Sequence, residues 1–399
     1  MNFTQFIPFI EGYFPILLTG FSFFCLFGWS AMLVRCTLVA RQLHELPDAQ
    51  IRDTYPRVSV LVPARNEAQK IRPALESLVG QDYPNLEIIV IDDRSTDATL
   101  SIADELSRKS PNLKLLRVDA LPDGWLGKNH ANQKGFEAST GEYLLFTDAD
   151  VVFEKSAVSR TVSYAMSSGA RHIVAYAKMM TEGPLEYAFI ALFGLLFTWK
   201  FNPRGARNPR NKKAYIGVGA FNFIQRSLYE TIGTHATLRA EVADDVMLGY
   251  HVKQQGCGTD VVKGMNLLSV RWREGLWDSI RGVERSAFPG IRFSWLWVGL
   301  GVFGTFAGLI APYWLIFFED PIAKGCAAIS ILLIALCYAV QGNSFSKVLL
   351  TTALHPVMSL LFLYGLLKSA IKITLDGGVV WRGTFYPIHI LKQETLGRS

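Results

Sequence analysis

The chain has 399 residues, of which 50% are hydrophobic and 19% are charged, and its formal net charge is +6. This composition is too apolar for one ordinary soluble domain and too charged for a protein embedded wholly in a membrane. The basic residues match no nucleic-acid-binding fold and are not interleaved with stacking aromatic residues, so the sequence gives no indication of nucleic acid as a partner.

Long uncharged segments lie near both ends of the chain. The first, residues 14–34, is long enough to cross a bilayer as a helix, and three more follow at 295–318, 325–346 and 348–367. His355-Pro356 interrupts the last of them, which could therefore be kinked or re-entrant. The first segment is too long for a signal peptide and lacks a basic stretch before it, so we expect a retained membrane anchor.

Charges beside these segments predict their orientation. Basic residues follow the first segment closely: Arg35, Arg41, Arg52 and Arg57. Such residues favour the cytoplasmic side, so we expect an integral membrane protein with a cytoplasmic catalytic domain, in the inner membrane if the source is bacterial. Three further spans would put the basic residues of the tail outside: Lys372, Arg382, Lys392 and Arg398. Either one C-terminal segment lies in the interface or the tail departs from the tendency.

The soluble middle of the chain contains one further apolar segment, residues 185–201, followed by the densest basic run, "NPRGARNPRNKK" at 202–213. This pair is typical of an interfacial helix on an anionic membrane surface. A buried core helix followed by a solvated loop fits equally well. The five cysteines show no pairing or zinc spacing, as expected for a reducing compartment.

Strand-like and helix-like segments alternate in the middle of the chain. Strands are predicted over 57–64, 86–93, 113–119 and 143–150, and helical patterns over 67–81, 99–109 and 128–139. The alternation predicts an α/β fold, a mostly parallel sheet with helices on both faces. No dinucleotide fingerprint or P-loop sequence is present.

Acidic side chains follow several of these strands, where parallel sheets bind their ligands. In "YLLFTDADVVF", Asp148 and Asp150 stand one residue apart at the end of an apolar run. Carboxylates this close resist ionising together, and a divalent cation such as Mg²⁺ or Mn²⁺ would remove that cost. Taken alone, the pair is more typical of a solvated acidic turn.

Five motifs taken together resemble the family 2 glycosyltransferases. They are "VSVLVPARNE", "IIVIDDRSTD", "GWLGKNHA", "FTDADVVF" and "ADDVMLGYHVKQQG", in the family's order and rough spacing. More narrowly, they resemble the membrane-anchored lipid-type members, which are ceramide-glucosyltransferase-like or hopanoid- or carotenoid-glycosyltransferase-like. The tail "VVWRGTFYP" at 379–387 is similar to that bacterial subgroup. The resemblance implies a glycosyltransferase A-type sheet that binds a nucleotide sugar.

The resemblance also implies a donor site for a nucleotide-diphosphate sugar, with UDP as the expected nucleotide, and assigns residues to it. The nucleotide would contact Pro63, Ala64, Arg65, Glu67, Asp93, Lys128, Asp148 and Gly219. Asp93 would accept from the uracil N3–H, and the Lys128 ammonium would suit phosphate oxygens. Each residue also has an ordinary structural role: Asp93 as a turn residue, Lys128 as a solvated lysine at a helix start, and Glu67 as a carboxylate favoured near a helix N-terminus.

Metal and catalytic roles follow from the same resemblance. Asp148 and Asp150 match the family's DxD, with Asp150 on the divalent metal that neutralises the leaving diphosphate. Asp244 and Asp245 match its acidic pair, and Asp245 would take the proton of the acceptor hydroxyl in a single inverting displacement. N-capping of a helix is the alternative role for Asp244. Gly217 and Gly219 would let backbone approach the ligand closely or would mark a bulged strand.

One motif departs from the family pattern. Many relatives carry (Q/R)xxRW after the base, whereas this chain has "GVERS" at 282–286, which keeps Arg285 and lacks the tryptophan. In processive synthases that tryptophan helps to bind the acceptor sugar, so its absence favours the addition of one sugar to a lipid acceptor. Arg285 would contact the diphosphate, and Arg281 could substitute for the missing residue.

The sequence therefore predicts four parts: an anchor and linker over 1–50, a cytoplasmic glycosyltransferase domain over 51–292, transmembrane helices over 293–371 and a tail over 372–399. The expected partners are a UDP-sugar, a lipid acceptor and the membrane. Two alternatives stay open. One is a processive polysaccharide synthase and exporter, and the other is a non-catalytic membrane scaffold or transport component.

Overall fold

A computed structural model of the chain describes residues 3–50, 54–381, 384–389 and 391. Contacts divide these residues into two compact units. We call the first the helical unit; it comprises the described residues of Met1–Arg41, Thr181–Lys200 and Arg273–Leu375. The second, the sheet unit, comprises those of Gln42–Met180, Phe201–Trp272 and Asp376–Ser399.

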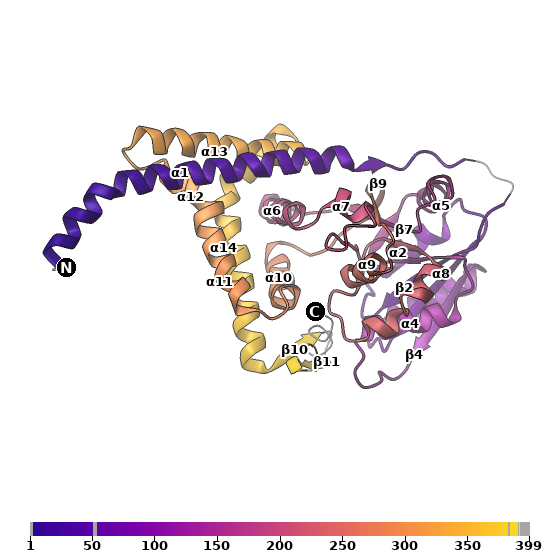
Figure 1. The fold of residues 1–399 in the computed structure, drawn as a ribbon. Helices are drawn as coiled ribbons and strands as arrows, with labels where there is room; N and C mark the ends of the chain where they lie inside the picture. Colours follow the sequence, from indigo (N-terminus) through magenta and orange to yellow (C-terminus); the bar gives the residue numbers. More distant parts are fainter. Residues whose placement is uncertain (1–2, 51–53, 382–383, 390, 392–399) are drawn as a thin grey trace. The chain divides into compact units, whose positions relative to one another are not determined.

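The sheet unit is built on one mixed sheet (Figure 1). Its strands are β1 (His44–Glu45), β2 (Val58–Ala64), β3 (Leu86–Asp93), β4 (Leu113–Val118), β5 (Tyr143–Phe146), β6 (Val151–Phe153), β7 (His172–Met179), β8 (Asn222–Gln225) and β9 (Asp260–Val270). The order is β1-β9-β7-β8-β5-β2-β3-β4, with β6 paired to β9. Strands β2 to β5 run parallel, whereas β8 is antiparallel to both β5 and β7.

The predicted mostly parallel sheet is confirmed, and the four predicted strands are β2 to β5. The three predicted helices are α2 (Ile71–Val79), α3 (Thr99–Lys109) and α4 (Gly127–Ala138). The strands after β5, including the antiparallel β8, were not predicted from the sequence. The remaining helices of this unit are α5 (Ala157–Ser168), α7 (Pro203–Arg207), α8 (Arg226–Thr231), the 3₁₀ helix η1 (His235–Leu238) and α9 (Asp244–Gln254).

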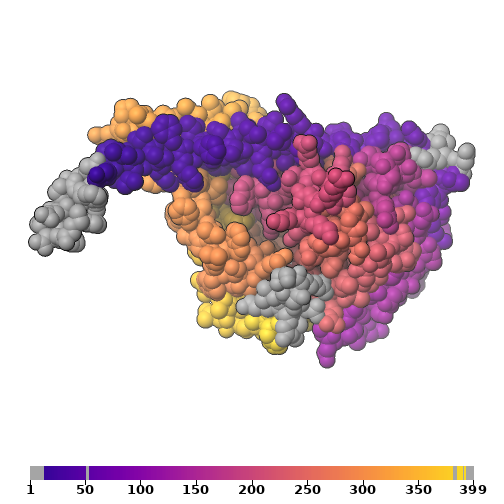
Figure 2. Space-filling model, in the orientation of Figure 1, coloured from indigo at the N-terminus to yellow at the C-terminus, as the bar shows by residue number. Residues whose placement is uncertain are grey.

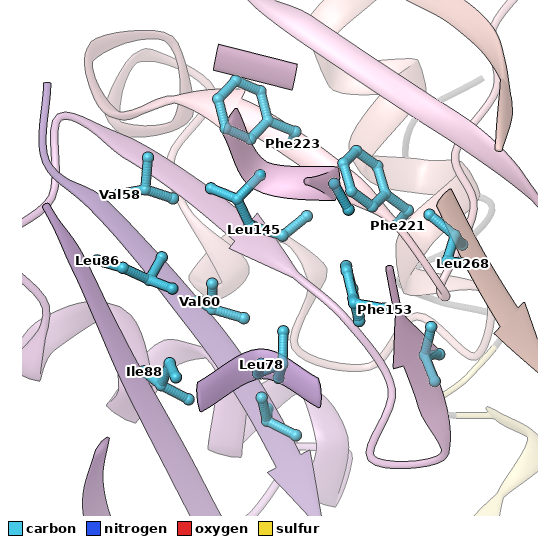
Figure 3. Close-up of a cluster of buried hydrophobic side chains, with 14 of the residues drawn as sticks. Val58, Val60, Leu78, Leu86, Ile88, Leu145, Phe153, Phe221, Phe223 and Leu268 are labelled. Atoms are coloured by element: carbon cyan, nitrogen blue, oxygen red, sulfur yellow. The ribbon is translucent and has the colours of Figure 1, made fainter. Parts of the chain in front are cut away.

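The central strands are apolar because both of their faces are covered. Every residue of β3 is buried, as is every residue of β2 except Pro63. On one face, Val60 and Ile88 meet Leu78 of α2 in the cluster shown in Figure 3. On the other, Leu61 packs with residues of α4 and α9 in a second cluster. Since successive strand residues point to opposite faces, the near-continuous apolar runs predict this double covering.

A buried glutamate ties the amino ends of β2 and β3 together. Glu87 accepts hydrogen bonds from Ser59 Oγ at 2.5 Å and from the Thr140 N–H at 2.6 Å, and it pairs with Arg57 at 3.3 Å. Burial raises the pKa of Glu87, but the bonds from Ser59 and Thr140 and the Arg57 charge outweigh it, so the pKa falls to about 2. The ionised carboxylate is therefore part of the fold.

The basic run after residue 201 is partly folded. Asn202 caps α7 by accepting from the Gly205 N–H at 3.1 Å. The fully buried Lys253 of α9 donates from Nζ to the carbonyls of Ala206 at 2.8 Å and Asn208 at 2.6 Å, at the other end of the same helix. An ammonium group at a helix C-terminus satisfies carbonyls that have no intrahelical partner.

The helical unit contains the apolar segments. Its elements are α1 (Phe3–Gln42), α6 (Pro184–Lys200), α10 (Leu276–Gly290), α11 (Trp295–Gly304), the π-helix η2 (Thr305–Ile310), α12 (Ala311–Leu315), α13 (Pro321–Val340) and α14 (Phe345–Asp376). Among the described residues, four helical stretches are long and apolar enough to cross a membrane: Tyr13–Gln42, Trp295–Leu315, Pro321–Val340 and Phe345–Asp376. Because α14 continues through Pro356, the re-entrant alternative for 348–367 is wrong.

The surface of these helices suits a lipid environment. In α1, Leu17 is 68% exposed and Phe27 is 74% exposed, and α1 is uncovered on the face shown in Figure 2. An apolar surface of this kind is compatible with membrane association. The helical unit includes α6 and residues 273–292, and the sheet unit includes the tail from Asp376. These units therefore divide the chain at other residues than the predicted domain boundaries.

We expect Glu87→Gln to destabilise the protein by about 2–3 kcal/mol at pH 7, because it replaces a carboxylate whose hydrogen bonds and ion pairs favour ionisation. The lowered pKa means that this stabilisation is present above the unfolded pKa and is lost as pH falls toward 2. Thermal unfolding in detergent at pH 7 and pH 3 measures both effects.

The exposed Glu76→Gln provides the matched control, since Glu76 is 55% exposed and lies on α2 of the same unit. It should change stability by less than about 0.5 kcal/mol. A difference between Glu87→Gln and wild type that is as large at pH 3 as at pH 7 would contradict the role of ionised Glu87.

Candidate functional site

The predicted nucleotide contacts lie at the carboxyl ends of the parallel strands. Pro63 and Ala64 are the last residues of β2, and Arg65 and Glu67 follow in its exit loop. The loop is held to the next strand's exit, since the Glu67 N–H donates to Thr99 Oγ1 at 2.7 Å. The strand register thus brings segments far apart in the sequence to one edge.

Asp93 ends β3 among basic groups. Its buried carboxylate pairs with Arg94 Nε at 2.7 Å and with Arg65 Nη1 at 3.8 Å. A Cβ on Gly127, the first residue of α4, would lie 2.3 Å from Asp93 Oδ2, so only glycine permits this approach. From the tail, Tyr386 Oη accepts from the Gly127 N–H at 3.4 Å. The tail motif found in the sequence therefore contributes to this end of the site.

Lys128 joins the second group of predicted residues. It is the second residue of α4, and its Nζ lies 2.8 Å from Asp148 Oδ1 after β5 and 3.6 Å from Asp244 Oδ1 at the start of α9. Burial lowers the pKa of Lys128, but Asp148, Asp244 and Asp245 outweigh it and raise the pKa above its ordinary value. Lys128 is thus a permanent cation among carboxylates.

Gly219 marks the point where these side chains converge. A Cβ built on it would lie 2.9 Å from Asp148 Oδ2, 3.4 Å from Asp245 Oδ2 and 3.5 Å from Lys128 Nζ. Three predicted residues from separate parts of the chain therefore face one backbone position. The sheet accounts for this, because β8 returns antiparallel beside β5 and places its preceding turn over the carboxyl end of β5.

The two acidic residues at the start of α9 differ in protonation. Burial raises the pKa of Asp244, but the Lys128 charge and His235 outweigh it, so the pKa lies below its ordinary value. Burial and the neighbouring Asp244 charge raise the pKa of Asp245 to about 6. Asp244 is therefore a fixed anion, whereas Asp245 can take up and release a proton near neutral pH.

Asp150, the second carboxylate of the DxD, lies near the charges of Glu67 and Lys70. Burial, followed by the charges of Asp148 and Glu67, raises its pKa to about 7. Among the described residues, no group of three or more His, Cys, Asp or Glu side chains forms a complete metal site. Two carboxylates with excess negative charge nevertheless fit a Mg²⁺ or Mn²⁺ ion whose remaining ligands are phosphate oxygens and water.

A small pocket lies between these groups. It is lined by Lys128, Asn132, Phe146, Thr147, Gly219, Asn222, His235, Asp244, Asp245 and Leu248. The sequence analysis did not identify the polar residues Asn132, Asn222 and His235, because each stands alone without a spacing that indicates a function. Only the fold brings them to the acidic pair.

Gly217 has a packing role. A Cβ on Gly217 would lie 1.6 Å from the Asp245 carbonyl oxygen, and one on Gly249 would lie 2.0 Å from that of Ile216. These two glycines let the segment before β8 lie directly against α9. The predicted bulged strand is wrong, since residues 214–218 are not part of a strand.

Arg285 lies in α10 of the helical unit. Its Nε donates to the Arg281 carbonyl at 3.2 Å, and its Nη2 pairs with Asp278 Oδ1 at 3.5 Å. Its predicted contact with the diphosphate stays a prediction.

Comparisons with known proteins test the resemblance to a family. Residues 59–233 match the family described as "Glycosyl transferase family 2". The probable glycosyltransferase YdaM of Bacillus subtilis (strain 168) is 34% identical over 212 residues, 50% of this chain and 48% of the relative. The chain thus spans about half the length of that relative. The resemblance found in the motifs is confirmed.

Two further proteins are similar over most of the chain. The 4,4'-diaponeurosporenoate glycosyltransferase of Staphylococcus aureus (strain N315) is 22% identical over 364 residues, 88% of this chain and 94% of the relative. The solved mannosyltransferase PcManGT from Pyrobaculum calidifontis, in complex with GDP-Man and Mn²⁺, has a TM-score of 0.53 at 18% identity and covers 90% of this chain and 99% of that chain. At this identity the second likeness shows the fold.

We expect Gly219→Ala to lower kcat/KM by about 10- to 100-fold, because the new methyl group occupies the point where Asp148, Asp245 and Lys128 converge. The fold should survive, since the nearest atoms belong to side chains. Steady-state kinetics and the unfolding temperature separate the two effects.

Gly325→Ala is the control, because a Cβ at Gly325 meets nothing within 4 Å. It should leave kcat/KM within about twofold of wild type. If both alanine variants retain full activity, the pocket beside Gly219 is not the reaction site.

Proposed function

We propose that this chain, whose residues 59–233 match glycosyl transferase family 2, transfers one sugar from a nucleotide-diphosphate sugar to a membrane lipid. The nucleotide would be UDP, and the transfer would invert the configuration at the anomeric carbon. The observation that carries the proposal is the convergence of Lys128, Asp148 and Asp245 beside Gly219, at the carboxyl end of the sheet.

The donor would lie along this edge of the sheet. Asp93 would accept the N3–H of uracil while Arg65 and Arg94 hold its carboxylate. Lys128 would exchange part of its contact with Asp148 for a phosphate oxygen, since a compact ammonium suits that charge. Each of these contacts uses a group that is already positioned in the sheet unit.

The DxD residues would hold a cation beside the diphosphate. Asp148 and Asp150 would be its protein ligands, and Asp150, whose pKa is raised to about 7, would be ionised by its presence. The bound ion would supply Lewis-acid neutralisation of the negative charge that develops on the leaving diphosphate.

Asp245 would act as the base. In a single displacement the acceptor oxygen forms a bond to the anomeric carbon, the bond from that carbon to the diphosphate breaks, and the acceptor proton passes to Asp245. A pKa of about 6 suits this role at neutral pH. Asp244 is unsuited, because its lowered pKa leaves it a weak base paired with Lys128.

Three observations support a lipid acceptor. Four helical stretches in the described part of the chain are long and apolar enough to cross a membrane. The Staphylococcus aureus relative, which matches over most of both chains, is a 4,4'-diaponeurosporenoate glycosyltransferase. The motif after the acidic pair lacks the tryptophan of processive synthases. We infer a cytoplasmic sheet unit that receives a lipid from the inner leaflet.

The test incubates the purified full chain with each labelled common nucleotide sugar, Mn²⁺ and a bacterial membrane lipid extract. We expect a single labelled sugar on lipid with a UDP-sugar as donor, and we expect EDTA to lower the rate at least about 100-fold. A ladder of products would instead indicate a polysaccharide synthase. Absence of both transfer and donor hydrolysis with every donor would contradict the proposal.

We expect Asp245→Asn to lower kcat by about 10³-fold or more while the Kd for UDP stays within about twofold, because the amide keeps the shape and cannot accept the proton. In the wild type, kcat should fall about tenfold per pH unit below pH 6, as Asp245 becomes protonated. Rates are measured at saturating Mn²⁺, so that Asp150 stays ionised.

Asp104→Asn, an exposed position on α3, is the matched control and should behave like wild type. Loss of UDP binding together with transfer in Asp245→Asn would show a structural role for this residue. A flat profile between pH 5 and pH 7 would indicate an acceptor that arrives without a proton, such as a carboxylate.

A further inference from the structure

A buried phenol and imidazole lie behind the acidic pair. Tyr229 of α8 is 0% exposed and His235 of η1 is 2% exposed. Tyr229 Oη lies 2.6 Å from His235 Nδ1 and also accepts from the His235 backbone N–H at 2.9 Å. On the other side of the ring, Nε2 lies 3.2 Å from Asn132 Nδ2 and 3.8 Å from Asp244 Oδ2.

The contacts of Tyr229 determine which ring nitrogen is protonated. A phenol has one proton to donate, and among the described residues the contacts of Tyr229 Oη offer only His235 Nδ1 as an acceptor. If Nδ1 carried a proton, the phenolic oxygen would accept twice and its own buried proton would lack a partner. Burial also lowers the pKa of His235, so the ring is neutral. The proton therefore resides on Nε2.

The match of hydrogen-bond donors and acceptors also determines the orientation of the Asn132 amide. An Nε2–H cannot bond to an N–H, whereas Asn132 Oδ1 is buried and has no hydrogen-bond partner among the described residues. Exchanging the two ends of the amide lets Oδ1 accept from Nε2–H and removes that unsatisfied acceptor. The NH₂ group then turns toward the pocket that Asn132 lines together with Lys128 and Asp245.

We propose that Tyr229 and His235 are positioning residues for the transfer reaction: Tyr229 fixes the Nε2–H tautomer of His235, and His235 in turn orients the Asn132 amide as a hydrogen-bond donor into the pocket. The same N–H lies 3.8 Å from Asp244 Oδ2 and acts on that carboxylate through its dipole. The assignment rests on the proposed function only for the identity of the reaction. The tautomer and the amide orientation follow from the contacts of the sheet unit alone.

This arrangement has a consequence for the acidic pair. The neutral Nε2–H supplies a dipole to Asp244 without supplying a charge, so Lys128 remains the cation that pairs with it. Asp244 stays ionised and paired with Lys128, and the proton of the acceptor goes to Asp245. Tyr229 and His235 therefore affect kcat and leave donor recognition at Asp93 unchanged.

The tautomer is tested in the wild-type full chain in detergent, labelled with ¹⁵N-histidine, by long-range ¹H–¹⁵N NMR. The signals of His235 are assigned by their loss in His235→Asn. We expect a protonated Nε2 and an unprotonated Nδ1. A protonated Nδ1 would overturn the proposal, and this measurement requires neither a known acceptor nor an active enzyme.

Tyr229→Phe tests the link to turnover, because it removes one oxygen and keeps the ring. We expect kcat to fall about tenfold, the donor KM to stay within about twofold, and His235 to show a mixture of tautomers. Tyr164→Phe is the matched control. The Tyr164 hydroxyl donates to Asp260 Oδ2 at 2.7 Å, and neither residue lines the pocket. This variant should lower the unfolding temperature similarly and leave kcat unchanged.

Equal loss of kcat in Tyr164→Phe and Tyr229→Phe, or an unchanged kcat in Tyr229→Phe, would overturn the positioning role. If Tyr229→Phe fails to fold, His235→Asn takes its place in the kinetic comparison, with the wild-type tautomer as the independent measurement. If the wild type shows the Nε2–H tautomer but no transfer, the proposed function is contradicted. The contacts of Tyr229, His235 and Asn132 would stand.

Discussion

The site depends on one half-buried cation. The ammonium group of Lys128 lies 2.8 Å from one carboxylate and 3.6 Å from another, and these carboxylates come from the end of β5 and the start of α9. Without it, Asp148 and Asp244 would face each other and Asp245 as unscreened like charges in a partly desolvated pocket, where each would resist ionisation. Lys128 keeps Asp244 ionised, and Asp244 in turn raises the pKa of Asp245. The protonation of the whole site follows from that position.

Sheet topology explains why these groups meet. Strands β2, β3 and β5 run parallel, so their exits share an edge, and the antiparallel β8 brings Gly219 to the same place from the opposite direction. The glycines at 217 and 249 then let α9 lie against the segment before β8. Close backbone packing therefore sets the position of the acidic pair. Gly217 and Gly249 are needed because backbone atoms lie where a larger residue would place its Cβ.

Much of this was predictable from the sequence because the signals are local. The strands before Asp93 and Asp148 are continuous apolar runs, and the motifs stand in a recognisable order. The antiparallel β8 was not predictable, since a four-residue strand has too little periodicity to identify. His235 and Asn132 carry no signal either, because a lone polar residue acquires a role only through its tertiary neighbours. The assignment of α6 to the helical unit likewise depends on contacts that a composition shift cannot show.

The balance of charge gives an independent reason for a cation with the donor. Ten Arg, Lys, Asp and Glu side chains of the described residues gather at this edge: the basic Arg65, Lys70, Arg94 and Lys128, and the acidic Glu67, Asp93, Asp148, Asp150, Asp244 and Asp245. Fully ionised, they carry two net negative charges, and burial, followed by the charges of neighbouring carboxylates, raises the pKa values of Asp150 and Asp245. A diphosphate adds negative charge, so its binding is unfavourable unless positive charge enters with it. Under the proposed function, Asp148 and Asp150 would hold a divalent ion that restores the balance, and Asp245 would keep the proton affinity that a base requires.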